Sequence, residues 1–181
     1  SLLCLLSMLF SSLLVVFEKK NKAYLRNFIA PVTSKAKVGS TYLIALSLFA
    51  IQLLILIGIG LWLKIPFCET MFVPLLLGAS LFVLLGMFIG YATNSIHSAV
   101  LVSSILLILL LFFSDILLPV EAIQHLRWVA SYNPLTLLST ALKKSLFSIY
   151  SIKELGLLAL ISLVFFALCL ITEKIAIRRE H

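Results

Sequence analysis

Charged side chains are scarce in this sequence. Only 12% of its 181 residues are Asp, Glu, Lys or Arg, whereas 62% are hydrophobic. A soluble domain of this length needs a charged surface, so the composition excludes that class and indicates a membrane protein. The apolar runs are long and continuous, whereas a membrane β-barrel needs short strands of alternating polarity. The predicted fold class is therefore an all-α polytopic transmembrane bundle.

Motifs for catalysis and metal binding are also lacking. The cysteines and histidines are isolated and follow no metal or redox spacing; they are Cys4, Cys68, Cys169, His97, His125 and His181. No glycine-rich phosphate loop of the Walker type occurs, so the chain is not expected to bind ATP by that route. We therefore predict that the chain is not an enzyme and that it carries no catalytic residue, metal site or cofactor.

Uncharged stretches predict about five spans, since a spanning helix needs roughly 20 residues. Residues 70–114 contain no charge and would form a helix of roughly 67 Å, more than twice the hydrocarbon thickness. They must therefore form two helices, and the polar residues 93–98 supply the turn. The expected spans of this single transmembrane domain are about 1–17, 40–63, 71–92, 98–118 and 153–173. Because residue 1 lies inside an apolar run, we expect a further segment before it.

Acidic residues are outnumbered by basic ones, 7 to 14, which gives a net charge of +7. The basic residues flank the apolar spans, so they predict topology rather than nucleic-acid binding. With five alternating spans, residues 18–37 and the C-terminal tail fall on the same side and hold nine of the 14 basic residues. This bias predicts a multi-pass protein of the cell membrane with a cytoplasmic C-terminus.

Residues 18–31 have the pattern of an amphipathic helix. Its apolar face contains Tyr24, Leu25, Phe28 and Ile29, its basic face contains Lys19, Lys22 and Arg26, and Pro31 ends it. Such a helix lies along the membrane surface. Two roles remain open on the residues alone: an anchor that touches lipid headgroups, or a docking surface for a cytoplasmic partner.

Two further patterns concern packing and the opposite side of the membrane. Residues 119–146 are too polar for a span and too apolar for a free loop, and they predict a re-entrant segment on the outer side. Gly86 and Gly90 form a small-xxx-small pair, with Gly78 two turns earlier, which allows close approach of helices. The pair has two possible roles: packing of helices within the chain, or contact between two copies in a dimer.

The order of these elements resembles the C-terminal part of ABC-2 type transporter permeases, the membrane subunits of type V-like ABC exporters. The first matching stretch runs from Glu18 through Arg26 to Pro31, with Gly39 opening the next span. The second comprises Asp115, Pro119 and Glu121, followed by Asn133, Pro134 and Thr136. The sequence departs from the family at Lys22 and Ala23, where a Gly-Thr pair is common, and it lacks the family's first span.

The resemblance implies that residues 18–31 are a coupling helix that docks on a separate ABC ATPase subunit, which binds ATP and Mg. The implied coupling residues are Glu18, Lys22, Tyr24, Arg26, Phe28 and Pro31. Residues 119–146 would form the outer gate, with Asp115, Pro119, Glu121, Asn133 and Pro134 as its residues. The implied partners are that ATPase, a second permease copy (identical or a close paralogue) and membrane lipid.

Two alternatives come from other classes. A secondary transporter or channel fragment that needs no ATPase predicts a mid-membrane charge or an inverted repeat, and the sequence has neither. A non-transporting scaffold would use the basic helix only to bind anionic lipid. Retention of an ATPase subunit by the intact protein distinguishes the permease from both.

Overall fold

The computed structural model describes residues 2–20, 34–63, 69–114, 132–147 and 152–179. In these residues all regular structure is helical, which confirms the predicted all-α class. The elements are α1 (Leu2–Lys20), α3 (Ser34–Trp62), the short 3-10 helix η1 (Glu69–Met71), α4 (Phe72–Ala92), α5 (Ile96–Phe112), α7 (Pro134–Leu146) and α8 (Ile152–Arg179).

Within the described ranges, three helices are long and apolar enough to cross a membrane by length and composition. The stretches are Ala36–Ile59 within α3, Phe72–Ala92, which is α4, and Ile152–Ile175 within α8. The apolar helix α5 has 17 residues, and α1 has 19 residues, of which the last three are charged. The chain is thus a membrane-embedded helical bundle, and the count of five spans stays a prediction.

The predicted break within residues 70–114 is confirmed. Helix α4 ends at Ala92 and α5 begins at Ile96. The amide of Thr93 donates to the carbonyl of Ile89 at 3.0 Å and closes the last turn of α4. Ser95 then caps α5, because its side chain accepts a hydrogen bond from the amide of Ser98 at 3.1 Å.

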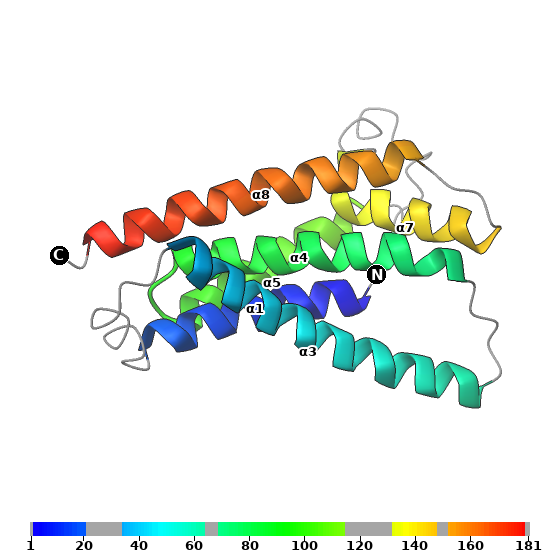
Figure 1. Cartoon of the computed structure of the whole chain (residues 1–181), viewed down its shortest axis with the longest axis horizontal. Helices are drawn as coiled ribbons and strands as arrows, with labels where there is room; N and C mark the ends of the chain where they lie inside the picture. The colour runs from blue at the N-terminus through cyan, green and yellow to red at the C-terminus, as the bar shows by residue number, and fades with distance from the viewer. Residues whose placement is uncertain (1, 21–33, 64–68, 115–131, 148–151, 180–181) are drawn as a thin grey trace.

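The helices run back and forth along one common direction (Figure 1). Helices α1, α4 and α8 run toward one end, and α3 and α5 return from it. We call this end the Lys37 end, since it holds Lys37 together with the C-termini of α1, α4 and α8. The opposite end holds α7, η1 and the first turn of α8, and we call it the α7 end.

Helix α4 lies at the centre of the bundle. It contacts α1, α3, α5, α7 and α8. Its side chains Phe82, Leu85 and Ile89 are buried together with Leu5 of α1 and Leu158 of α8. Because α4 is enclosed by neighbours, it is apolar on all sides rather than along one stripe.

Two glycines let α1 and α4 approach closely. A Cβ added at Gly86 would lie 2.1 Å from the backbone oxygen of Met8, and one at Gly90 would lie 2.7 Å from Cβ of Val15. Both contacts are within the chain, so this structure confirms the intrachain alternative for the small-xxx-small pair. At the α7 end, Gly78 makes room in the same way for Leu138.

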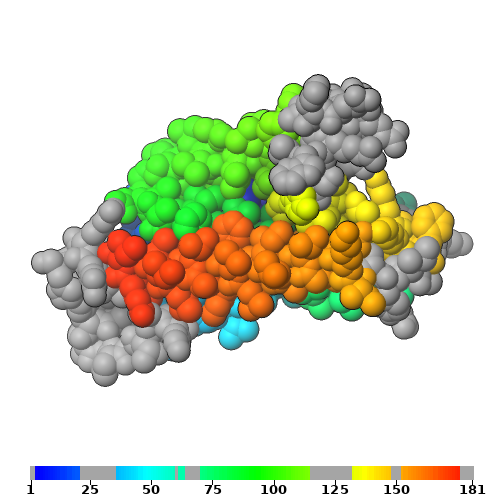
Figure 2. Space-filling model, turned by 90° about the horizontal axis from the view of Figure 1, so that it is seen from above, coloured from blue at the N-terminus to red at the C-terminus, as the bar shows by residue number. Residues whose placement is uncertain are grey.

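The outer faces of α3 and α8 are apolar and exposed. Along α3, Leu54 and Leu61 are each 67% exposed, and Trp62 is 83% exposed. Helix α8 lies along the outside of the bundle (Figure 2), and it contacts α3, α4 and α7. Exposed leucines and isoleucines occur on both helices, as contact with lipid requires.

Candidate functional site

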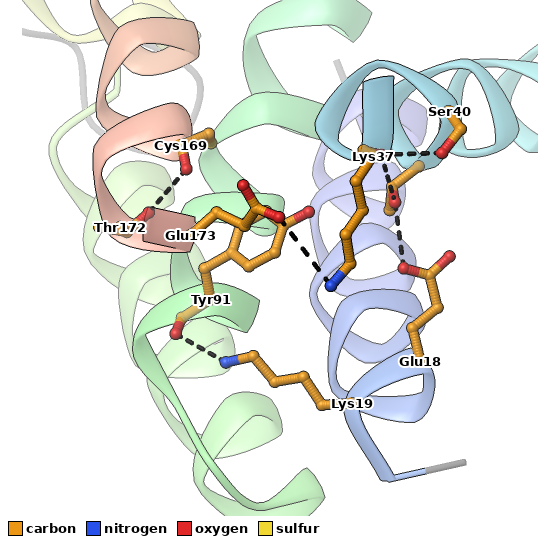
Figure 3. A network of polar contacts seen from close by, with 9 residues as sticks. Glu18, Lys19, Lys37, Ser40, Tyr91, Cys169, Thr172 and Glu173 are labelled. Atoms are coloured by element: carbon orange, nitrogen blue, oxygen red, sulfur yellow. Dashed lines mark hydrogen bonds and ion pairs between the residues drawn. The ribbon is translucent and has the colours of Figure 1, made fainter. Parts of the chain in front are cut away.

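The Lys37 end carries a cluster of polar contacts between four helices, α1, α3, α4 and α8 (Figure 3). The residues that flank 21–33 in the sequence belong to it, because α1 ends at Lys20 and α3 begins at Ser34. The chain therefore enters and leaves residues 21–33 from one place on the bundle. This placement makes the cluster the candidate functional site.

Lys19 joins the end of α1 to the end of α4. Its ammonium group donates to the carbonyls of Gly90 at 3.0 Å, Tyr91 at 2.7 Å and Thr93 at 3.1 Å. The same group lies 5.8 Å from the centroid of the Tyr91 ring. A cation at a helix C-terminus satisfies carbonyls that lack partners within the helix and also interacts favourably with the helix dipole. Lys19 thus fixes α1 against α4.

Glu18 joins α1 to α3. Its Oε2 accepts a hydrogen bond from Oγ1 of Thr41 at 3.0 Å. Burial raises the pKa of the Glu18 carboxyl, while the Thr41 hydrogen bond and the charge of Lys37 oppose that rise. The predicted first span ends at residue 17, but helix α1 continues without a break to Lys20. Glu18 therefore lies in the same helix as that span, beyond its apolar part.

Lys37 joins α3 to α8. Its Nζ lies 3.9 Å from Oε1 of Glu173, whose side chain is fully buried. Figure 3 shows Lys37 between the carboxylates of Glu173 and Glu18. Charges withdrawn from water are tolerated only when an opposite charge or hydrogen-bond donors compensate them. The cluster therefore holds the ends of α1, α3, α4 and α8 by charge as well as by packing.

Polar contacts at the α7 end are built around Asn133. Its side chain accepts from the amide of Leu135 at 3.0 Å and donates through Nδ2 to the carbonyl of Leu110 at 2.9 Å. Pro134 takes the first position of α7, where its missing N–H is not needed. This Asn-Pro pair both starts α7 and attaches it to the end of α5. Lys144 of α7 forms an ion pair with Glu154 of α8.

The sequence-predicted site residues are distributed unevenly over the structure. Glu18 belongs to the polar cluster at the Lys37 end, and Asn133 and Pro134 are at the α7 end, so these two predicted groups lie at opposite ends of the bundle. The other predicted site residues lie outside the described part of the chain. They are Lys22, Tyr24, Arg26, Phe28, Pro31, Asp115, Pro119 and Glu121.

Three residues of the cluster were not predicted as a site. Lys37 and Glu173 appeared in the sequence only as charges that border apolar runs, and Lys19 appeared only on the basic face of residues 18–31. Lys37 and Glu173 are 136 positions apart, so no local spacing pairs them. The signal that could have found these residues is a charge directly at the end of an apolar run. Such a charge lies close to the ends of neighbouring helices, where it can form contacts between them.

Replacing Lys19 by Met is expected to weaken the α1–α4 connection. The variant loses a charged donor to three carbonyls, and hydrogen bonds of charged groups contribute about 1.5–3 kcal/mol each. We expect a destabilisation of about 2 kcal/mol, because water reaches part of this site and replaces part of the loss. Thermal unfolding in detergent measures it. Lys20→Met is the matched control, since Lys20 is exposed, and equal unfolding temperatures for the two variants would contradict the capping role.

The fold and the cluster together define a class. The chain is a helical membrane protein whose charged contacts, among the described residues, lie toward its two ends, with apolar helices between them.

The family follows from comparison with known sequences. The profile of the family described as ABC-2 type transporter matches residues 1–147. The match covers well over half of the chain, so the protein belongs to that family, as the sequence motifs indicated. It is a membrane permease component of an ABC transporter, and the family implies an ATPase partner. Searches of curated proteins and of solved structures give no match.

Proposed function

We propose that this chain is the permease subunit of an ATP-driven ABC exporter. ATP and Mg bind to a separate ATPase subunit, which docks on residues 18–31 at the Lys37 end. That end faces the cytoplasm, in accord with the charge bias of the sequence. The outer gate comprises residues 119–146, whose described part includes α7 at the opposite end, and a second permease copy completes the pathway.

The observation that carries the proposal is the anchoring of the residues on either side of 21–33. Glu18 and Lys19 precede this segment and Lys37 and Thr41 follow it, and all four take part in contacts between helices. A partner that moves residues 21–33 therefore acts on ends of α1 and α3 that charged contacts hold to the neighbouring helices. The sequence predicts an amphipathic helix for residues 18–31, and such a helix is suited to act as a lever against a partner groove.

The absence of deep charges supports the exporter over a secondary transporter. In the part of the chain that the structure describes, charged side chains lie at or near helix ends, such as Glu18, Lys37, Glu154 and Glu173. Ion-coupled transporters place ionisable groups near mid-membrane, where they form part of the ion pathway. This bundle instead has its charges where a docked ATPase and an outer gate would meet it.

Reversing the charge of Arg26 tests the docking site. We expect Arg26→Glu to reduce the amount of ATPase subunit that co-purifies with the permease by about tenfold, because breaking one charged interfacial contact removes 2 kcal/mol or more. Lys153→Glu is the control, since Lys153 is an exposed cation at the α7 end. Equal retention by wild type and Arg26→Glu, or a loss confined to Lys153→Glu, would place the ATPase elsewhere.

A further inference from the structure

Helix α8 carries one carboxylate near each of its ends. Glu154 lies in its first turn, and Glu173 lies 19 residues later, beside the Lys37 cluster. At 1.5 Å per residue the two are about 28 Å apart, close to the thickness of the bilayer hydrocarbon. One helix thus presents a negative charge at both ends of the bundle.

Each carboxylate is paired with a lysine of a different helix. Glu173 pairs with Lys37 of α3, the helix that follows residues 21–33. Glu154 pairs with Lys144 of α7, the helix that follows residues 115–131. Asn133 attaches α7 to α5 as well. The two pairs therefore connect α8 to the helices that border the proposed coupling segment and the proposed outer gate.

Most of the part of α8 between the two carboxylates, from residue 157 after Gly156 to residue 172, is suited to move as one piece. Residues 157–172 contain neither glycine nor proline, and these are the usual causes of a sharp kink. Cys169 donates from its thiol to the carbonyl of Leu84 at 3.3 Å, which joins α8 to the central helix α4. Leu158 is buried in the core. A displacement of one end of α8 is therefore carried to the other.

Ion pairs suit this connection better than apolar contacts would. A buried pair adds little net stability compared with well-packed apolar side chains, and its best-attested role is to fix one register or switch position. Coulomb attraction also acts over several ångströms, so the 3.9 Å pair can follow a partner that shifts. At the other end the contact is the Lys144–Glu154 ion pair, which is more exposed than the Lys37–Glu173 pair.

We propose that α8 is a rod that transmits movement between the two ends of the permease, with Glu173 and Glu154 as its positioning residues. Lys37 passes a displacement of α3 to Glu173, and Glu154 passes it to Lys144 and α7. This inference rests on the proposed function, because the displacement is supplied by the ATPase at residues 18–31.

The test reads the conformation of α7 when the ATPase is trapped. An environment-sensitive fluorophore is attached at Phe147→Cys, a site that is 78% exposed at the end of α7. Cys68 is replaced by Ser, while Cys4 and Cys169 are buried and stay in place. The full permease–ATPase complex in nanodiscs is then given MgATP and vanadate, and the fluorescence change is recorded.

Wild-type complex is expected to show a fluorescence change, and Glu173→Gln and Glu154→Gln are each expected to reduce it about fivefold or more, the range of a coupling free energy. Lys174→Gln is the matched control, because Lys174 is exposed and adjacent to Glu173. A purely structural role would change the yield or stability of the complex but not the response of the assembled complex.

The outcomes separate the two proposals. A wild-type chain that retains no ATPase contradicts the proposed function. A wild-type complex that retains the ATPase but gives no fluorescence change overturns the rod alone, as does a full response in Glu173→Gln. If Glu173→Gln does not assemble, Glu154→Gln decides, since a full response in that variant also overturns the rod.

Discussion

Replacement of Gly86 by Leu is expected to prevent stable packing of the bundle. The first added carbon would lie 2.1 Å from the backbone oxygen of Met8 and 2.1 Å from Oγ of Ser11. The obstacle is partly backbone, so no change of rotamer can relieve it, and α1 must move away from α4. Overpacking of a core typically costs about 1–3 kcal/mol, and we expect about 3 kcal/mol or more here.

Gly58→Leu is the matched control for that prediction. A Cβ at Gly58 meets no atom within 4 Å, so the same substitution at that position has space. The measurement is the fraction of monodisperse protein after a temperature ramp in mild detergent. An unfolding midpoint for Gly86→Leu equal to that of Gly58→Leu would contradict the close α1–α4 packing.

Removing Lys37 is expected to produce the second large effect. Lys37→Met takes the lysine away from the fully buried carboxylate of Glu173. It also removes the positive charge that lies near the carboxylate of Glu18. Removal of one partner of a buried pair destabilises by about 3–5 kcal/mol, because the other charge stays buried. Glu173→Gln is expected to destabilise less, since the Lys37 side chain is 12% exposed and can turn its ammonium toward water.

The double variant Lys37→Met with Glu173→Gln isolates the pair. It removes both charges, so we expect it to be more stable than Lys37→Met alone by about 2 kcal/mol or more. Unfolding midpoints of the wild type, both single variants and the double variant give the interaction free energy. Additive effects of the two single substitutions would show that the pair has no coupling.

The sequence predicted those features that depend on local spacing. The polar residues 93–98 interrupt an apolar run too long for one helix, and the turn is found at residues 93–95, between Ala92 and Ile96. The pair Gly86 and Gly90 lacks side chains on one face of a helix, and that face is where α1 packs. In both cases the signal and the structure belong to the same few residues.

Contacts between distant segments were not predictable in this way. Lys19 was expected on the basic face of residues 18–31, but α1 extends through it, and its ammonium group binds carbonyls of α4. The Lys37–Glu173 pair joins helices whose proximity depends on the whole bundle. A sequence shows which charges border the apolar runs, whereas packing decides which of them meet.

The central claim is that this permease works with a separate ATPase. Its most direct test is the amount of ATPase subunit retained by the intact, tagged wild-type chain after gentle extraction from its native membrane. We predict about one ATPase subunit per permease, because each copy offers one docking segment at residues 18–31. A purified chain that is folded, embedded in lipid and free of any ATPase subunit would contradict the claim.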